Sequence, residues 1–243
     1  MRNSPARILL ADDSPANCKL VQACLSRQPY ELTIAGDGRE AVELFQAGEF
    51  DLVLMDILMP GMDGHEATRR IREWEQGNRV GATPIVALTA LRDDEEQARQ
   101  AGCTTSLKKP LRLPELLALV SSVVDGAAAP AAEGVAEDPP PPPARPGEPP
   151  VVRVEPELRE LIPEFLTTCR ADLQSVINAI EVGDFSAAAS CGHRMDGYGG
   201  GYGFGEITTG GGEIEEAAKR KDGQAALARA ESLLDYLDRV RVE

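Results

Sequence analysis

The sequence predicts an α/β domain with a five-stranded parallel sheet, followed by an all-α four-helix bundle. In the first half of the chain, short apolar runs closed by turn residues alternate with helical patterns, as in a sheet covered on both faces. Between residues 126 and 152 the chain is rich in Ala and Pro, a composition that cannot bury a core. Beyond it, apolar residues recur at helical spacing.

The predicted strands of the first half are short and apolar. They cover residues 6–11, 32–35, 52–55 and 84–88, and a fifth is closed by residues 107–110. The first helix begins at Ser14-Pro15, because proline is favoured in the first helical turn. The remaining helices are predicted at residues 37–48, 64–76, 93–101 and 114–124.

The second half of the chain predicts four helices joined by short loops, which is typical of an antiparallel bundle. The first begins at about Glu155, and Pro163 is expected to kink it or divide it in two. The second spans about residues 185–198, with Asp184 as its cap. The third and fourth cover about residues 205–220 and 224–240, and the run Gly210–Gly212 is expected to disturb the third.

The chain is acidic throughout. Its 243 residues carry a formal net charge of −15, and residues 1–125, 126–150 and 151–243 contribute −5, −3 and −7. This balance argues against nucleic acid as a partner. We find no membrane-spanning run and no signal peptide, and the five scattered cysteines fit reduced thiols. A cytoplasmic protein without a membrane partner is expected.

Polar side chains follow the predicted strands at the edge where open α/β sheets bind ligands. The first strand offers Asp12 and Asp13, the third Asp56, the fourth Thr89 and the fifth Lys109. Three carboxylates at one edge repel one another, so a cation is needed, and oxygen ligands suit Mg²⁺ (or Mn²⁺). A lysine and a hydroxyl beside them can hold phosphoryl oxygens. Singly these residues are more often structural, but together they predict phosphoryl transfer onto a carboxylate.

With these residues in view, residues 6–125 resemble a CheY-like receiver domain of two-component systems. Four segments carry the resemblance in the family's order and spacing: ILLADDS at 8–14, MDILMPGMDG at 55–64, PIVALTA at 84–90 and KP at 109–110. The resemblance implies flavodoxin-like strand order. It also implies that Asp56 is the phosphoacceptor and that the donor is a phosphohistidine of a histidine kinase or a phosphotransfer protein.

The same resemblance implies roles for individual residues. Mg²⁺ would be bound directly by Asp13, by Asp56 and by the backbone carbonyl of Leu58. Asp12 would act on the ion through water. Thr89 and the lysine of the KP pair would hold the phosphoryl oxygens, and the Lys–Pro peptide bond would be cis.

Two features depart from the receiver pattern, one at Ser106 and one at Leu58 and Leu91. Ser106 occupies the switch position, where the family has an aromatic residue, so we expect a muted response of the last strand–helix surface to phosphorylation. Leu58 and Leu91 lie two residues past the phosphoacceptor and past the threonine. Both are apolar, and we expect them to exclude attacking water and slow hydrolysis of the phosphoryl group.

Residues 192–204 resemble the core of a histidine phosphotransfer (HPt) domain, whose likeness covers roughly residues 153–243. His193 would be the phosphoryl carrier. It lies about 200° around the helix from the inward-facing Cys191 and Met195, so it is predicted to point to solvent. Small neighbours would let a partner protein approach. The family has lysine three residues later, whereas this chain has Asp196, which should favour the non-nucleophilic imidazolium and repel a phosphoryl group.

The predicted organisation is a receiver at residues 1–125, an Ala/Pro-rich linker at 126–152 and an HPt-like bundle at 153–243. The chain would be a phosphorelay protein, not an enzyme beyond self-phosphoryl transfer and autodephosphorylation. His193 would exchange the group with Asp56 or with another receiver domain. One alternative is an interaction module whose HPt-like domain docks without carrying phosphate, as Asp196 favours. Another is a phosphatase or phosphotransferase of haloacid-dehalogenase type, which Leu58 disfavours because those enzymes have a second aspartate there.

Overall fold

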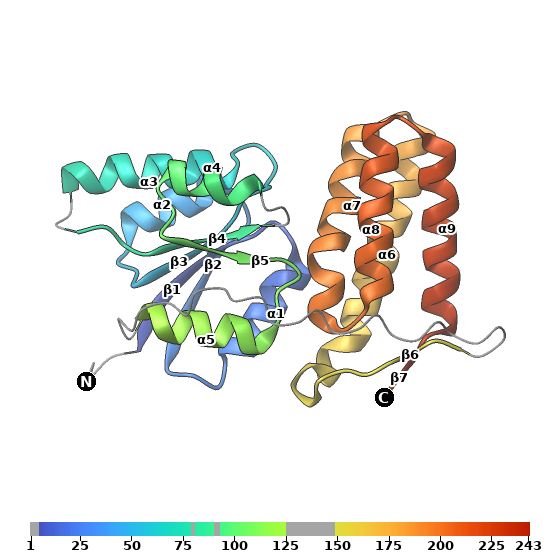
Figure 1. Cartoon of the computed structure of the whole chain (residues 1–243), viewed down its shortest axis with the longest axis horizontal. Coiled ribbons are helices and arrows are strands. Elements are labelled where there is room, and N and C mark those ends of the chain that lie inside the picture. The colour runs from blue at the N-terminus through green and yellow to red at the C-terminus, as the bar shows by residue number, and fades with distance from the viewer. Residues whose placement is uncertain (1–4, 79–80, 90–92, 125–148) are drawn as a thin grey trace. The chain divides into compact units, whose positions relative to one another are not determined.

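The computed structural model describes residues 5–78, 81–89, 93–124 and 149–243. The chain divides into two compact units, whose described parts are residues 5–124 (the first unit) and 149–243 (the second unit). Figure 1 shows that the first unit is an α/β fold and that the second is helical. Most of the predicted linker, residues 126–148, lies outside the described residues.

The first unit contains a five-stranded parallel sheet in the order β2-β1-β3-β4-β5, which confirms the predicted flavodoxin-like fold. Its strands are β1 (Ala6–Ala11), β2 (Tyr30–Ala35), β3 (Leu52–Asp56), β4 (Ile85–Thr89) and β5 (Thr105–Lys108). Every residue of β3 and β4 is buried. Because helices cover both faces of the sheet, these strands are continuous apolar runs in the sequence instead of alternating ones.

Five α-helices in the described residues cover this sheet: α1 (Pro15–Leu25), α2 (Gly38–Ala47), α3 (Gly64–Asn78), α4 (Asp93–Ala101) and α5 (Leu113–Val124). Helices α1 and α5 lie on one face, and α2, α3 and α4 lie on the other (Figure 1). Capping explains where two of them begin. The side chain of Ser14 accepts a hydrogen bond from the first turn of α1, and that of Asp37 does the same for α2.

Aromatic packing joins α2 to α3 in the first unit. The fully buried ring of Phe45 stacks on Phe50 with a centroid distance of 6.2 Å and meets Trp74 edge-to-face at 5.8 Å. Trp74 is the only tryptophan of the chain. Its fluorescence therefore reports on the first unit alone.

The second unit is a four-helix bundle, as predicted. Its described residues form α6 (Ile162–Glu181), α7 (Phe185–Gly199), α8 (Gly205–Lys219) and α9 (Gly223–Arg239). Each helix packs on the next, and α9 closes onto α6. Pro163 lies in the first turn of α6, after the 3₁₀ helix η1 (Pro156–Leu161), so it divides the predicted first helix instead of kinking it.

A short parallel ribbon closes the bundle at its base. Strand β6 (Val151–Val152) pairs with β7 (Arg241–Val242), and the N–H of Val154 donates to the carbonyl of Glu243 at 3.1 Å. The ribbon thus pairs residues 151–152, the last two of the predicted linker, with the bundle.

The bundle core is centred on Phe165. Its ring stacks on Tyr202 at 4.2 Å, and the rings of Phe204 and Tyr198 lie at 5.0 Å and 5.6 Å. The hydroxyl of Tyr198 donates to Asp172 at 2.8 Å. Burial and the neighbouring Cys169 and Asp172 raise the pKa of Tyr198, so this hydroxyl stays protonated and remains a donor.

Helices α7 and α8 pack backbone against backbone through glycines. A Cβ added to Gly192 would lie 2.7 Å from the backbone of both Gly211 and Glu215, and one added to Gly211 would lie 2.5 Å from the nitrogen of Asp196. Gly199 meets the backbone of Thr208 in the same way. We call this contact of Gly192, Gly199 and Gly211 with the facing helix the glycine seam. Any larger side chain there would push the helices apart.

The glycine seam corrects one expectation. Helix α8 continues regularly through Gly210–Gly212, although this run was expected to disturb it. Gly210 and Gly211 are buried against α9 and α7. The close packing offsets the helix-forming cost of glycine, which is about 1 kcal/mol for each residue.

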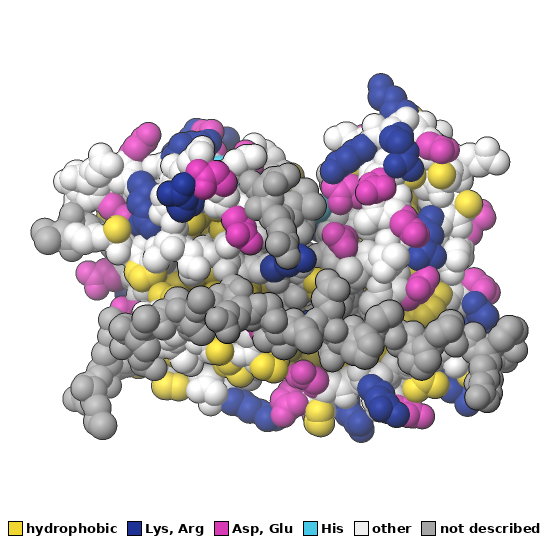
Figure 2. Space-filling model, in the orientation of Figure 1, with side chains coloured by type: hydrophobic (Ala, Val, Ile, Leu, Met, Phe, Trp, Pro, Cys, Tyr) yellow, Lys and Arg dark blue, Asp and Glu magenta, His cyan; other side chains and the backbone are white. Residues whose placement is uncertain are grey.

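The surface charges, the cysteines and the helix lengths of the described residues can be compared with the expectations from the sequence. Figure 2 shows acidic and basic side chains interspersed on the face of both units that it draws. All five cysteines are free and buried, and burial raises the pKa of Cys18 and of Cys169 to about 12. Among the residues that the structure covers, no helix has the length and apolarity that crossing a bilayer requires.

The glycine seam gives a paired test of stability. We expect Gly211→Ala to destabilise the second unit by roughly 1–3 kcal/mol, because the added methyl would overlap the backbone of α7. Gly212→Ala is the matched control, since its Cβ would lie 3.8 Å from Asp196, an ordinary contact. It should stabilise the helix by up to about 1 kcal/mol.

This pair is measured by urea unfolding of the whole chain, followed by far-UV circular dichroism. Fluorescence of Trp74 serves as the internal reference for the first unit. Equal effects of the two substitutions on stability would contradict the claim that α7 and α8 need glycine at position 211.

Candidate functional site

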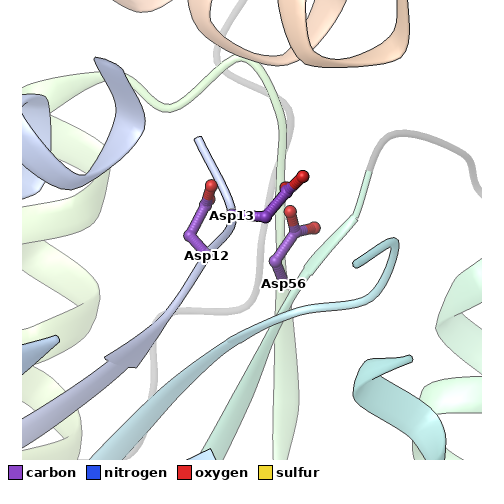
Figure 3. Close-up of side chains that lie close together, drawn as sticks. All are labelled: Asp12, Asp13 and Asp56. Carbon is purple, nitrogen blue, oxygen red and sulfur yellow. The ribbon is translucent and has the colours of Figure 1, made fainter. Parts of the chain in front are cut away.

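Three carboxylates meet where β1 and β3 end. Asp12 and Asp13 follow β1, Asp56 is the last residue of β3, and one oxygen from each lies within 4.8 Å of the others. Figure 3 shows the three side chains close together at this edge. Parallel pairing explains the meeting, because Ala11 lies opposite Met55 and the next residues of both strands therefore leave the sheet at the same level.

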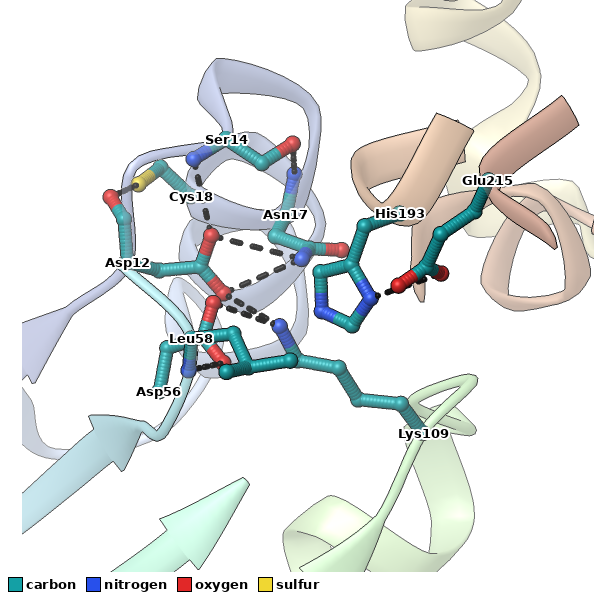
Figure 4. Close-up of polar contacts among 9 residues, drawn as sticks. All are labelled: Asp12, Ser14, Asn17, Cys18, Asp56, Leu58, Lys109, His193 and Glu215. Carbon is teal, nitrogen blue, oxygen red and sulfur yellow. Dashed lines mark hydrogen bonds and ion pairs between the residues drawn. The ribbon is translucent and has the colours of Figure 1, made fainter. Parts of the chain in front are cut away.

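Lys109, the residue after β5, reaches across to this acidic cluster. Its Nζ lies 2.8 Å from Oδ2 of Asp56 and 3.2 Å from Oδ2 of Asp12 (Figure 4). Burial alone would lower the pKa of Lys109, but the charges of Asp12 and Asp56 outweigh it and the pKa is raised. The peptide bond from Lys109 to Pro110 is cis, as predicted. The lysine is therefore a permanent cation within the cluster.

One ammonium does not balance three carboxylates. Burial raises the pKa of Asp12 to about 6, the charge of Asp56 adds to the rise, and the charge of Lys109 opposes it. The cluster keeps an excess of negative charge that a bound cation would neutralise. A donor set made only of carboxylate oxygens fits Mg²⁺, which prefers such ligands and retains several waters.

The other predicted residues lie as follows. Thr89 is the buried last residue of β4, at the same sheet edge as Asp56. The N–H of Leu58 donates to Oδ1 of Asp56 at 3.4 Å, and the Leu58 side chain is 44% exposed beside the cluster. Ser106 is a half-buried residue within β5. Leu91 lies outside the described residues.

The loop after β3 closes tightly on the cluster. The N–H of Gly64 donates to the carbonyl of Ile57 at 2.9 Å. A Cβ at Gly64 would collide with the carbonyl oxygen of Asp56. Only glycine permits this approach, so the first residue of α3 rests directly on the end of β3.

Two neighbours of the cluster were missed by the sequence analysis. The N–H of Ser14 donates to Oδ1 of Asp12 at 2.8 Å, and Nδ2 of Asn17 donates to both oxygens of Asp12 at 3.3 Å and 3.0 Å. The available signal was the helix start at Ser14. The first turn of a helix presents polar groups to the end of the strand before it.

In the second unit, His193 lies where α7 crosses α8. Its Nδ1 lies 3.1 Å from Oε2 of Glu215 (Figure 4). The other carboxylate oxygen of Glu215 lies 2.6 Å from Nζ of Lys219. Burial alone would raise the pKa of Glu215, but hydrogen bonds from His193 and Lys219 lower it. The ring is thus held against α8 and does not simply point to solvent. The angular position of His193 on its own helix could not predict this contact, because Glu215 belongs to α8.

Comparison with known proteins identifies relatives of the first unit. A family model described as the response regulator receiver domain matches residues 8–121. The polar-differentiation response regulator DivK of Brucella anthropi is 30% identical over 125 residues, which are 51% of this chain and 99% of DivK. The chain belongs to the response regulator receiver family.

Other similar proteins are larger or have been solved as isolated domains. The sensor protein GacS of Pseudomonas syringae pv. syringae is 42% identical over 116 residues, which are 47% of this chain and only 13% of GacS. A solved receiver domain, from the sensor histidine kinase PA1611 of Pseudomonas aeruginosa PAO1, has a magnesium ion in its active-site cleft. It is 37% identical, covers 50% of this chain and 99% of its own, and has a TM-score of 0.46. The family model ends before the second unit.

The balance of charge predicts the effect of removing Lys109. We expect Lys109→Ala to destabilise the first unit by roughly 3 kcal/mol in EDTA, because two buried carboxylates would lose their cation. Mg²⁺ should then restore more stability to the variant than it adds to the natural sequence. Urea unfolding followed by Trp74 fluorescence measures both effects. Lys108→Ala, at the exposed neighbouring residue, is the control, and an equally stable Lys109→Ala would contradict the prediction.

Proposed function

We propose that the protein is a phosphorelay component in which Asp56 accepts a phosphoryl group from a phosphohistidine. The observation that carries the proposal is the set of three carboxylates and Lys109 at one edge of a receiver-family sheet. Receiver domains take phosphoryl groups from histidine kinases or HPt proteins, so these are the expected donors.

In the proposed transfer, a carboxylate oxygen of Asp56 attacks phosphorus and forms the acyl phosphate. The P–N bond of the donor breaks, and its imidazole leaves with the electron pair as a neutral ring, because its other nitrogen already carries a proton. Lys109 neutralises charge on the phosphoryl oxygens, and the hydroxyl of Thr89 donates to another of them.

Mg²⁺ would be held by Asp13, Asp56 and the carbonyl of Leu58, with Asp12 acting through water. When bound, the ion supplies the charge that lets an anionic carboxylate approach an anionic phosphoryl group.

Two further roles remain predictions. The exposed apolar side chain of Leu58 would limit access of water to the acyl phosphate and slow its hydrolysis. The lack of an aromatic side chain at Ser106 would mute the response of the last strand–helix surface.

For the second unit we infer an HPt-like domain with His193 as carrier, joined to the receiver by the linker. The contact between His193 and Glu215 supports this reading. A carboxylate facing Nδ1 favours the tautomer with the proton on Nδ1, which leaves the lone pair of Nε2 as the nucleophile. His193 would exchange the phosphoryl group with Asp56 or with another receiver.

A second candidate function has its own support. Asp196 lies one turn from His193, where HPt domains have lysine. Glu215 is paired with Lys219, so Asp196 is the carboxylate whose charge opposes an incoming phosphoryl group. This charge favours an interaction module that docks a partner without carrying phosphate.

The two candidates differ in where a small-molecule phosphodonor leaves its label. We expect the wild type with Mg²⁺ to carry a base-labile acyl phosphate that Asp56→Asn abolishes. A second, acid-labile phosphate that disappears in His193→Gln would identify His193 as a carrier. A label on Asp56 alone would favour docking. Label that persists in Asp56→Asn with the stability of an acyl phosphate would contradict the role of Asp56.

The charge at position 196 can be tested directly. We expect Asp196→Lys to speed phosphorylation of His193 by at least several-fold, because it reverses the repulsion of the phosphoryl group. Glu181→Lys makes the same change of charge at an exposed residue of α6 and should have little effect. Rates are measured with a phosphorylated receiver as donor, and equal rates for both variants would show that Asp196 is irrelevant.

A further inference from the structure

Asn17 is a buried amide beside the acidic cluster whose two ends are used unequally. It lies in the first turn of α1 and is 1% exposed. Its Nδ2 donates to both oxygens of Asp12, as Figure 4 shows. An ionised carboxylate only accepts hydrogen bonds, so the nitrogen must be the end that faces Asp12.

The other end of the amide lacks a partner. Oδ1 of Asn17 is buried and accepts no hydrogen bond from any part of the chain that the structure describes. A buried acceptor without a donor destabilises the fold, so we looked for a donor that this oxygen could accept from. If Asn17 served only to join α1 to β1, nothing would compensate for this unsatisfied oxygen.

A hydrated divalent ion at the acidic cluster would supply the donor. Mg²⁺ usually keeps several of its waters when it binds to carboxylates, and each of these waters carries O–H donors. Residues that hold metal ligands or metal-bound water typically change metal affinity by 10–100-fold when removed.

We propose that Asn17 is a positioning residue of the metal site: its nitrogen fixes the Asp12 carboxylate, and its oxygen accepts from a water bound to the ion. This inference rests on the proposed metal-dependent function of the cluster. It adds a neutral residue that tunes the affinity of the site without contributing charge.

The test compares Asn17→Leu with the wild type. Leucine keeps the volume of the side chain and deletes both polar ends. We expect the Kd for Mg²⁺, measured by calorimetry on the full chain, to rise by 10–100-fold. Asn78→Leu, the same exchange at an exposed residue of α3, should leave the Kd unchanged. A Kd for Asn17→Leu within two-fold of the wild type would overturn the proposal.

A stability measurement separates positioning from simple packing. If Asn17 only packs α1, the leucine variant loses the same stability in EDTA and in saturating Mg²⁺. If it positions the metal site, the stabilisation by Mg²⁺ itself shrinks, by about 1.4 kcal/mol for each ten-fold rise in Kd. Unfolding is followed by Trp74 fluorescence.

A third measurement needs no variant and covers the case in which Asn17→Leu does not fold. In the wild type, the ¹³Cγ resonance of Asn17 should move when Mg²⁺ binds, because its oxygen gains a donor, whereas that of Asn78 should stay in place. An unmoved Asn17 resonance in a protein that binds Mg²⁺ would overturn the inference about Asn17 alone. A wild type that binds no Mg²⁺ would instead overturn the proposed function.

Discussion

Repulsion among carboxylates that share one sheet edge is the constraint on which the first unit depends. Parallel strands end at the same level, so Asp12 and Asp56 cannot avoid each other once β1 and β3 pair. The repulsion is reduced by Lys109, which follows β5, and by hydrogen-bond donors at the start of α1. These groups leave the charge incompletely balanced, and that imbalance is the basis on which we propose this edge as a site for a cation and a phosphoryl group. The grouping of these charges follows from the strand order.

The second unit is organised by a steric constraint instead of an electrostatic one. The glycine seam brings the backbones of α7 and α8 into contact, which places Glu215 beside His193. A charged residue on the facing helix thereby becomes part of the surroundings of the ring. The two proposed phosphoryl sites thus have different origins. In the first unit carboxylates are brought together, and in the second glycines allow two helices to approach closely.

The sequence was most informative where buried elements are local. Strands such as β3 and β4 are buried on both faces, so their apolar runs and the polar residue at each end could be read directly, and the whole acidic cluster followed from them. Contacts between helices could not be read in this way. The pairing of Glu215 with His193 depends on the register of α8 against α7, and the bonds from Asn17 to Asp12 depend on how a helix turn folds back over a strand. From the sequence alone, Gly210–Gly212 were expected to disturb α8, because the residues of α7 and α9 on which they pack lie elsewhere in the chain.

Gly64 gives the first unit a mechanical property. The first residue of α3 rests on the carbonyl of Asp56 with no side chain between them, so no compressible layer separates the two elements. A displacement of the main chain at Asp56 would therefore move the first turn of α3 as well. Trp74 lies ten residues further along α3, about 15 Å at the rise of an α-helix, and its ring meets Phe45 edge-on. Trp74 is the only indole of the protein, so its fluorescence would report a displacement of α3 that begins at the acidic cluster.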